Sequence, residues 1–164
     1  MYADITIKAH CDNPAEAESI LLGLNATYQG QDVQTDTHYE TDLGKLKYRK
    51  GNVEHVLMQY NRVQLDDAKK TEVYLYLKNP TAATITAVCG GKKVIAEVRK
   101  VRKIFFIDNV KFHIDQVEGQ GNFLEIEAID LDGSVGEEVL RQQCDYYKEQ
   151  LQIQEEDLVP EGYI

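Results

Sequence analysis

The residues most suited to chemistry in this sequence are charged side chains that alternate with apolar ones. Lys45, Lys47 and Arg49 alternate with Leu46 and Tyr48. The same alternation recurs in three later groups: Lys100 with Arg102; Lys111 with His113 and Asp115; and Glu125 with Glu127. Residues two apart on a strand share one face of a sheet, so each group forms a charged stripe. Arginine and lysine bind phosphate oxygens, and carboxylates bind hard divalent cations.

Two placements of these stripes agree with the residues alone. In the first, the charges form the solvated outer face of an amphipathic sheet whose apolar face packs beneath helices. In the second, the sheet closes into a barrel and the charges point inward. A charged interior is stable only if its charges pair, remain hydrated or hold a ligand. Composition and alternation do not choose between the two placements.

The overall composition is that of a globular protein. The 164 residues predict one domain, residues 1–164, with 43% hydrophobic and 28% charged residues. No apolar run approaches the length of a membrane-spanning helix, and the first residues lack the pattern of a signal peptide. The three cysteines are dispersed and form no CxxC pair, which argues against a disulfide framework or a zinc site. We therefore expect a cytoplasmic protein with no membrane partner.

The net charge limits the classes of partner. At −10 it argues against a nucleic-acid-binding protein, which normally carries a basic excess. The overall field also repels small anions. A phosphate site in this chain would therefore require a local concentration of Lys and Arg.

Alternation with a period of two predicts the strands that would position these residues. The predicted strands cover residues 1–9, 28–39, 45–49, 54–64, 70–77, 93–108, 110–117 and 123–130. Helix starts are predicted at Asn13-Pro14, at Asn79-Pro80 and at Ser134 with Glu137 three residues later. The three helices would end near residue 24, at Gly90-Gly91 and near residue 151, and the tail would be irregular or a short helix. The predicted class is α+β with a large antiparallel sheet.

The order of several motifs resembles that of bacterial CYTH proteins. Asp36-Thr37-His38-Tyr39, followed by Gly44-Lys45-Leu46-Lys47-Tyr48-Arg49, is similar to the family's DTYF…GRLKLR segment. Asn109 to Asp115 is similar to NVRIHLD, and the run through Glu127 is similar to D-x-V-E-G-L-G-x-F-x-E-x-E. The resemblance covers nearly the whole chain in order, and it is nearest to the class IV adenylate cyclase branch.

The resemblance implies a triphosphate tunnel, which is a closed or nearly closed antiparallel barrel of about eight strands with helices packed outside. It implies a metal site for Mg²⁺ or Mn²⁺ at Asp4, Glu125 and Glu127, and catalytic roles for Lys8 and Asp115. The implied substrate-binding residues are Lys47, Arg49, Arg62, Lys69, Lys100, Arg102 and Lys111. A tunnel with a net basic interior predicts that Arg102→Ala would weaken triphosphate binding with little loss of fold.

One departure from the family pattern concerns the metal site. The family begins E-x-E-x-K, whereas this chain reads Asp4-Ile5-Thr6-Ile7-Lys8 and so lacks the second carboxylate. Losing an oxygen ligand weakens the binding of a hard cation. The resemblance favours an enzyme that converts ATP to cyclic AMP and pyrophosphate, in a form expected to dimerise. The alternatives are a triphosphatase acting on tripolyphosphate, a nucleotide or thiamine triphosphate, and a tunnel that binds such a compound without turnover.

Overall fold

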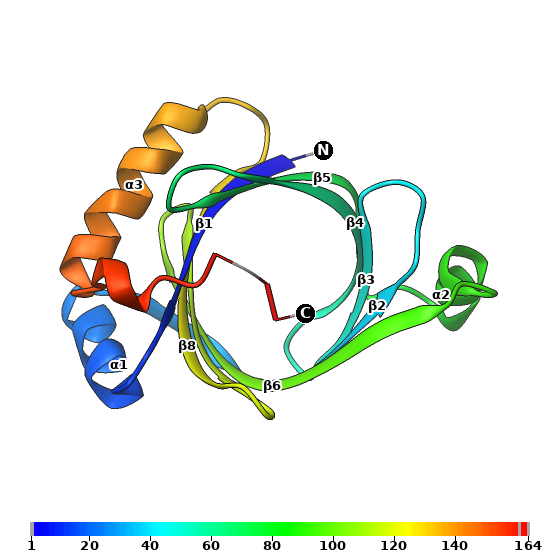
Figure 1. Ribbon diagram of the computed structural model, residues 1–164, viewed down its shortest axis with the longest axis horizontal. Coiled ribbons are helices and arrows are strands. Elements are labelled where there is room, and N and C mark those ends of the chain that lie inside the picture. Colours follow the sequence, from blue (N-terminus) through cyan, green and yellow to red (C-terminus); the bar gives the residue numbers. More distant parts are fainter. Residues whose placement is uncertain (1, 161, 164) are drawn as a thin grey trace.

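The centre of the computed structural model, which describes residues 2–160, 162 and 163, is a barrel built from antiparallel strands. Eight strands are found in the described residues: β1 (Tyr2–His10), β2 (Thr27–Tyr39), β3 (Lys45–Lys50), β4 (His55–Gln64), β5 (Lys69–Lys78), β6 (Val94–Ile107), β7 (Val110–Val117) and β8 (Gly121–Asp130). They pair in the order β1-β5-β4-β3-β2-β6-β7-β8, and β8 returns to β1 to close the ring. Figure 1 looks down this ring. The predicted closed barrel with helices outside is confirmed.

Strand β1 closes the barrel because it pairs with β5 on one side and β8 on the other. Thr6 lies opposite Lys69 of β5 and opposite Glu127 of β8. The alternation predicted for this strand is present. Ile5 and Ile7 face the helices outside, whereas Asp4 and Lys8 face the interior. All four side chains are buried, since both faces of the strand are covered.

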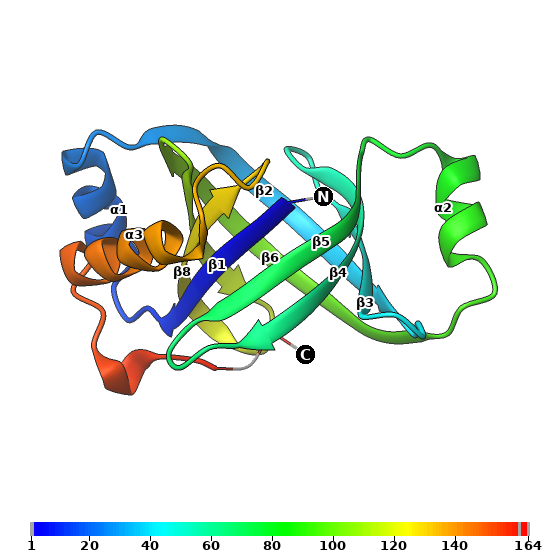
Figure 2. The same cartoon turned by 90° about the horizontal axis from the view of Figure 1, so that it is seen from above.

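The main apolar core lies outside the barrel, between its wall and two helices. Helices α1 (Pro14–Gly23) and α3 (Glu137–Gln150) cover the side formed by β1, β7 and β8, as Figures 1 and 2 show. The side chains buried between these layers include Ile5, Ile7, Leu21, Phe105, Phe112, Ile126, Leu140 and Cys144. Helix α2 (Ala82–Cys89) extends from the opposite side of the ring. Because the outer faces of the strands supply this core, the inner faces can carry charge.

The helix starts test the predicted capping residues. Helix α1 begins as predicted, because the Asn13 side chain accepts the Glu16 backbone N–H at 3.1 Å. Helix α2 begins two residues later than predicted. Asn79 adopts a positive φ of 50° at the end of β5, and the cap is Thr81, whose hydroxyl accepts the Thr84 N–H at 3.1 Å. A hydroxyl in this geometry satisfies a helix N-terminal N–H that an asparagine turned away cannot reach.

The predicted start of α3 at Ser134 is wrong, because Gly136 is its N-cap. The preceding turn is organised by two carboxylates instead. Asp130 accepts the N–H groups of Gly133 and Gly136, both at 2.9 Å, and Asp132 accepts the Ser134 N–H at 2.9 Å. Such side-chain bonds to the backbone compete with helix formation, so the helix starts after the turn.

The chain beyond α3 returns to one mouth of the barrel. A single 3-10 turn, η1 (Glu155–Asp157), precedes an extended stretch in which Val159 donates its N–H to the Lys8 carbonyl at 2.8 Å. Figure 1 shows this tail passing across the mouth of the ring. Within the described part of the chain, no helix combines the length and apolar character that crossing a bilayer requires.

Candidate functional site

The charged stripes point into the barrel, which decides between the two placements that the sequence left open. They surround a cavity of about 360 Å³. Ten of the predicted site residues line it: Asp4, Lys8, Lys47, Arg49, Arg62, Lys100, Arg102, Lys111, Glu125 and Glu127. Two predicted residues lie elsewhere. Asp115 is buried behind Arg102, and Lys69 lines a small neighbouring pocket that shares Lys8, Arg62 and Glu125 with the cavity.

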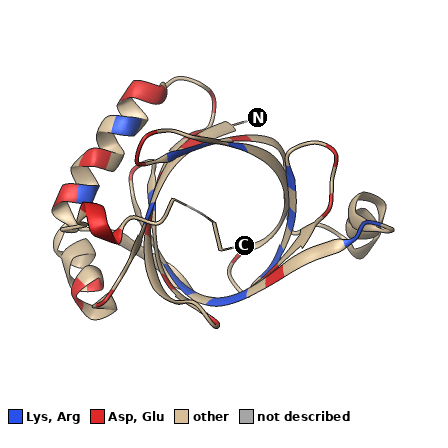
Figure 3. Cartoon of the chain, viewed as in Figure 1, with Lys and Arg blue, Asp and Glu red and all other residues tan. Residues whose placement is uncertain are grey.

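The cavity has the opposite charge balance to the whole protein. Of the described residues that line it, nine are Lys or Arg and five are Asp or Glu. The chain as a whole carries −10. Figure 3 shows Lys and Arg distributed around the barrel wall, while acids predominate on α3 and the segment that follows it. Low-dielectric walls concentrate such a local field, so the cavity can attract an anion that the rest of the surface repels.

One wall of the cavity carries a connected set of ion pairs, here called the β6–β8 network: Arg102, His113, Asp115 and Glu125. Arg102 donates from Nε and Nη2 to the two oxygens of Asp115 at 2.7 and 2.8 Å. His113 Nδ1 contacts Glu125 Oε1 at 2.7 Å, and Arg102 Nη2 lies 3.5 Å from the same oxygen. Burial alone would raise the pKa of Asp115, but the Arg102 guanidinium holds it below its usual value.

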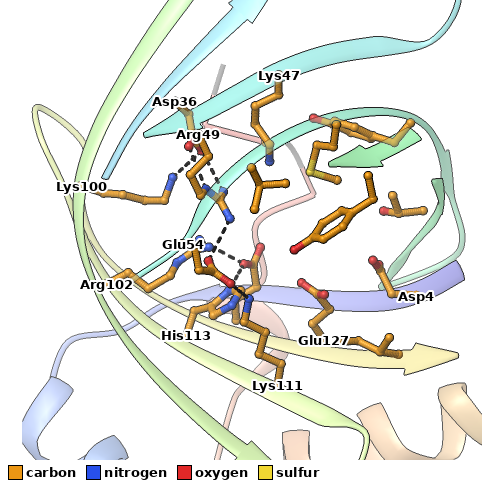
Figure 4. Close-up of a pocket in the computed structure, with 18 of the residues that line it drawn as sticks. Asp4, Asp36, Lys47, Arg49, Glu54, Lys100, Arg102, Lys111, His113 and Glu127 are labelled. Atoms are coloured by element: carbon orange, nitrogen blue, oxygen red, sulfur yellow. Dashed lines mark hydrogen bonds and ion pairs between the residues drawn. The ribbon is translucent and has the colours of Figure 1, made fainter. Parts of the chain in front are cut away.

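A second set of pairs joins β2, β3 and β6 through Asp36 (Figure 4). Its two oxygens accept Arg49 Nε and Nη2, both at 2.8 Å, and one of them also accepts Lys100 Nζ at 2.6 Å. Burial alone would raise the pKa of Asp36, but Arg49, Lys47 and Lys100 together hold it well below its usual value, so the carboxylate stays ionised. Burial, with the charges of Arg49 and Arg102, lowers the pKa of Lys100 to about 7. A bound phosphate would therefore favour the charged form of Lys100.

The wall opposite the β6–β8 network carries Lys45, Lys47 and Arg62, here called the β3–β4 cations. Among the residues described, no carboxylate lies within 4.0 Å of any of the three. The Tyr60 ring lies between two of them, 5.3 Å from Lys47 Nζ and 5.5 Å from Arg62 Cζ. Burial, and then the charge of Arg49, lowers the pKa of Lys47 well below its usual value. An anionic ligand would relieve this cost, so these cations are suited to phosphate.

Two carboxylates, Asp4 and Glu127, face the cavity from β1 and β8 and lie close together in Figure 4. Burial, and next the charge of Glu127, raises the pKa of Asp4 well above its usual value. Thr6 stands where the family has its second glutamate. Its Oγ1 donates to Asp4 at 3.1 Å, so it orients the remaining carboxylate. A cation between two such groups would remove their repulsion. The pair therefore fits a divalent metal that takes one or two carboxylates and completes its shell with phosphate oxygens.

The third predicted metal ligand, Glu125, has other neighbours. Its oxygens contact His113 and Arg102, and Lys8 Nζ lies 3.8 Å away. In residues 2–160, 162 and 163, no group of three or more His, Cys, Asp or Glu side chains is arranged to hold a metal. The donor set on this wall is thus the Asp4–Glu127 pair.

Glu54, Asp36 and Tyr163 are among the residues of the site that received no role from the sequence. The signal for Glu54 was its parity, since it precedes β4 on the same face as Met58 and Arg62. Tyr163 comes from the tail. Its hydroxyl donates to Asp115 at 2.6 Å, and its ring centroid lies 3.4 Å from Lys8 Nζ. No strand alternation could have predicted that contact.

The barrel, the basic cavity and the carboxylate pair together define a tunnel protein built for a compound with several negative charges. The CYTH domain family model matches residues 4–163. The chain belongs to the CYTH family, as the resemblance predicted, and this family binds triphosphate compounds in a metal-dependent manner.

Individual relatives match almost end to end. A candidate adenylate cyclase of Methanocaldococcus jannaschii is 23% identical over 172 residues, covering 98% of this chain and 96% of the relative. A Pyrococcus horikoshii structure has a TM-score of 0.75 at 26% identity and covers 98% of this chain and 96% of its own. A Hippeastrum protein described as an adenylyl cyclase with dominant triphosphatase activity has a TM-score of 0.63 at 13% identity, covering 100% of this chain and 92% of its own.

Proposed function

We propose that this protein is a metal-dependent enzyme that binds ATP and converts it to cyclic AMP and pyrophosphate. One observation carries the proposal: the β3–β4 cations and the Asp4–Glu127 pair line the same cavity. Cations without a carboxylate partner among the described residues suit the phosphates, and the carboxylate pair suits the metal that accompanies them. The candidate cyclase of M. jannaschii supports the choice of reaction.

In this reaction the ribose 3′-hydroxyl gives up its proton to solvent and its oxygen attacks the α-phosphorus, while the bond from that phosphorus to the bridging oxygen of the β-phosphate breaks as pyrophosphate leaves. Charge accumulates on the departing phosphates, which the surrounding cations stabilise without reorganising. Because Asp36 holds Arg49 and Lys100, and Asp115 holds Arg102, these donors are fixed before the ligand arrives. Catalysis would then consist mainly of positioning and charge stabilisation.

Asp4 and Glu127 would hold Mg²⁺ or Mn²⁺ together with the triphosphate. When bound, such an ion neutralises phosphate charge and polarises the P–O bond. The neighbouring side chains have supporting roles. Thr6 orients Asp4 through its 3.1 Å hydrogen bond, and Glu125 orients His113 and Lys8.

The two residues expected to be catalytic would have different roles. Lys8 faces the cavity and is held between the Tyr163 ring and Glu125, so it can donate to a phosphate oxygen. Asp115 is 1% exposed and is occupied by Arg102 and the Tyr163 hydroxyl. We assign Asp115 as a positioning residue that holds Arg102 and assign Lys8 as the one that touches the substrate.

Triphosphate hydrolysis is the second candidate. The same cations and metal would serve an attack by water on a terminal phosphorus, and the Hippeastrum protein of this fold has a dominant triphosphatase activity. Thr6 in place of the family glutamate favours a third outcome, a tunnel that binds a triphosphate without converting it.

The test is a turnover assay of the purified protein with ATP, GTP, thiamine triphosphate and tripolyphosphate, each with Mg²⁺ and with Mn²⁺. Cyclic AMP and pyrophosphate are the expected products, and Lys47→Ala should remove them whereas Arg99→Ala, on an exposed pair with Glu97, should not. Orthophosphate alone would replace the cyclase proposal with hydrolysis. Tight binding without any product would reduce the function to ligand binding.

A further inference from the structure

The aromatic side chain that the tail places inside the barrel contacts groups from separate strands. Tyr163 donates its hydroxyl hydrogen to Asp115 Oδ2 of β7 at 2.6 Å. Its ring centroid lies 3.4 Å from Lys8 Nζ of β1 and 5.7 Å from Lys100 Nζ of β6. Both ammonium groups are within the distance at which an aromatic ring attracts a cation. Strands β1 and β6 are separated in the ring by β7 and β8, so Tyr163 connects cations that the sheet itself keeps apart.

The position of Tyr163 is fixed by contacts to two parts of the barrel. The tail joins β1 where Val159 donates its N–H to the Lys8 carbonyl at 2.8 Å, and it then crosses the mouth of the ring (Figure 1). Gln120, in the turn between β7 and β8, donates from Nε2 to the Tyr163 carbonyl at 2.8 Å. The Tyr163 ring also packs edge to face against Phe123 of β8, with centroids 5.1 Å apart. These contacts place the tyrosine before any ligand arrives.

The Tyr163 hydroxyl binds a carboxylate that already holds Arg102. Asp115 accepts Arg102 through both oxygens, at 2.7 and 2.8 Å, and the tyrosine donates to one of the two. Burial, and next the charge of Asp115, raises the pKa of Tyr163 above its usual value, so the phenol keeps the proton that it donates. Hydrogen bonds to an ionised group are among the stronger ones in proteins. The hydroxyl therefore helps to hold the fork that orients Arg102.

The Tyr163 ring holds Lys8 without cancelling its charge. Burial lowers the pKa of Lys8, and the charge of Glu125, 3.8 Å from Nζ, opposes that fall. The ring face also favours the charged form of the ammonium, but it brings no negative charge of its own. A carboxylate in the same place would hold Lys8 and would repel a phosphate. Because the ring is neutral, the ammonium keeps its positive charge for an anionic ligand.

Tyr163 lines the same cavity as the cations that it contacts. Lys8, Lys100 and Arg102 all face that cavity, and each is held on one side by the tyrosine or by a group that the tyrosine binds. A side chain that is fixed beforehand loses less freedom when a ligand binds to it. Holding these cations in place should therefore raise the affinity for a polyanion.

We propose that Tyr163 is a positioning residue of the triphosphate site, acting through Lys8 and through the Arg102–Asp115 pair. The C-terminal tail is then part of the binding site, although its tyrosine neutralises no charge on the ligand. This inference rests on the proposed function and adds to it a residue that no strand supplies. A ring that merely filled the place of a phosphate would have the opposite effect, because its removal would then strengthen binding.

The experiment measures by calorimetry the dissociation constant of α,β-methylene ATP with Mg²⁺, a compound whose carbon bridge prevents the release of pyrophosphate. Tyr163→Phe keeps the ring on Lys8 and removes the hydrogen bond to Asp115, so the affinity should fall about threefold. Tyr163→Leu removes the ring as well, and the affinity should fall about tenfold. Tyr146→Leu, which changes an exposed tyrosine of α3, is the matched control and should leave the affinity unchanged.

A thermodynamic cycle with Lys8 separates positioning from a purely structural role. In a Lys8→Met protein, Tyr163→Phe and Tyr163→Leu should bind the compound equally within about twofold, because the nearer ammonium is gone. Thermal melts identify the folded variants, and Tyr163→Phe alone tests the hydroxyl if Tyr163→Leu does not fold.

Three results would overturn the inference while leaving triphosphate binding in place. They are unchanged affinity in both tyrosine variants, tighter binding by Tyr163→Leu than by the parent, and a ring effect that survives the loss of Lys8. A parent protein that does not bind the compound would overturn the proposed function and this inference with it.

Discussion

The two walls of the cavity contain the same residue types in different states. In the β6–β8 network each cation meets a carboxylate, and Arg102 is held by both oxygens of Asp115. Across the cavity, the β3–β4 cations have no carboxylate within ion-pair distance among the described residues, and Lys47 is buried nonetheless. Removing one partner of a buried pair destabilises a protein because an uncompensated charge remains, and a buried cation without a partner likewise reduces stability.

The two walls therefore have different roles: one maintains the fold and the other binds the ligand. The network fixes the geometry of the barrel wall, and its charge is largely cancelled before a ligand arrives. The β3–β4 cations instead leave positive charge uncompensated, so their neutralisation is left to the ligand. Four substitutions test this division, from the largest expected effect to the smallest.

Removing Arg102 should break the paired wall. Arg102→Ala leaves Asp115 buried without its main cation and removes one of the cations beside Glu125, so the free energy of unfolding should fall by about 3–5 kcal/mol. Chemical denaturation measures the change. Arg99→Ala, three residues away on the exposed face, should cost at most about 1 kcal/mol. An Arg102→Ala protein as stable as its parent would show that the network is not structural.

Removing Lys47 should change the free energy of unfolding in the opposite direction. Lys47→Met ends the burial of a cation without a carboxylate partner in the described chain, so the unfolding free energy should rise by about 1 kcal/mol. Its affinity for tripolyphosphate should fall about tenfold, as expected when a charged hydrogen bond is lost. Denaturation and calorimetry on one preparation give both numbers. Lower stability together with unchanged affinity would place Lys47 with the structural residues.

Adding a carboxylate beside Asp4 tests whether the Asp4–Glu127 pair binds a metal. Thr6→Glu places a third acid near Asp4 and Glu127, which should lower stability without metal by about 1 kcal/mol through like-charge repulsion. Mn²⁺ should then raise the melting temperature more than it does in the parent, because binding to the folded state stabilises it. Thermal melts with and without Mn²⁺ measure this. An equal rise in both proteins would argue against metal binding at this pair.

The smallest expected effect concerns His38, which lies beside the β3–β4 cations on β2. Burial, and next the charge of Lys47, lowers its pKa to about 4 in the folded protein, against about 6.5 unfolded. The unfolded chain therefore binds more protons between these values, and stability should rise with pH from about 4 to 6.5. His38→Gln should flatten this slope in denaturation curves, whereas His10→Gln, at the exposed end of β1, should not. An unaltered slope would place the acid sensitivity elsewhere.

Strand alternation predicted most of the barrel because it is a local signal. The parity of Lys45, Lys47 and Arg49 held along β3, and Lys111, His113 and Asp115 share the inner face of β7. Whether that face points inward depends on closure of the ring, which residues 3–10 and 123–130 complete together. Only the motif order indicated that outcome.

Pairing within the cavity could not be predicted in the same way. Asp36 and Lys100 are far apart in the sequence yet share a 2.6 Å contact, and Tyr163 reaches Asp115 from the tail. Arg102 was expected to be removable without loss of fold, whereas its forked pair with Asp115 points to a structural role. Parity places a side chain on a face but does not say which neighbour it meets there.

The pairing of β1 with β8 has a consequence for how the chain folds. It joins residues more than a hundred positions apart, and such non-local contacts form slowly because a long loop must be closed first. The register that closes the ring also sets Thr6 opposite Glu127 and brings Asp4 to the same wall. Any intermediate with β1 detached therefore holds half of the carboxylate pair on each side of an open seam. Added Mn²⁺ should accordingly slow unfolding more than it speeds folding, because the two ligands come together only as the seam closes.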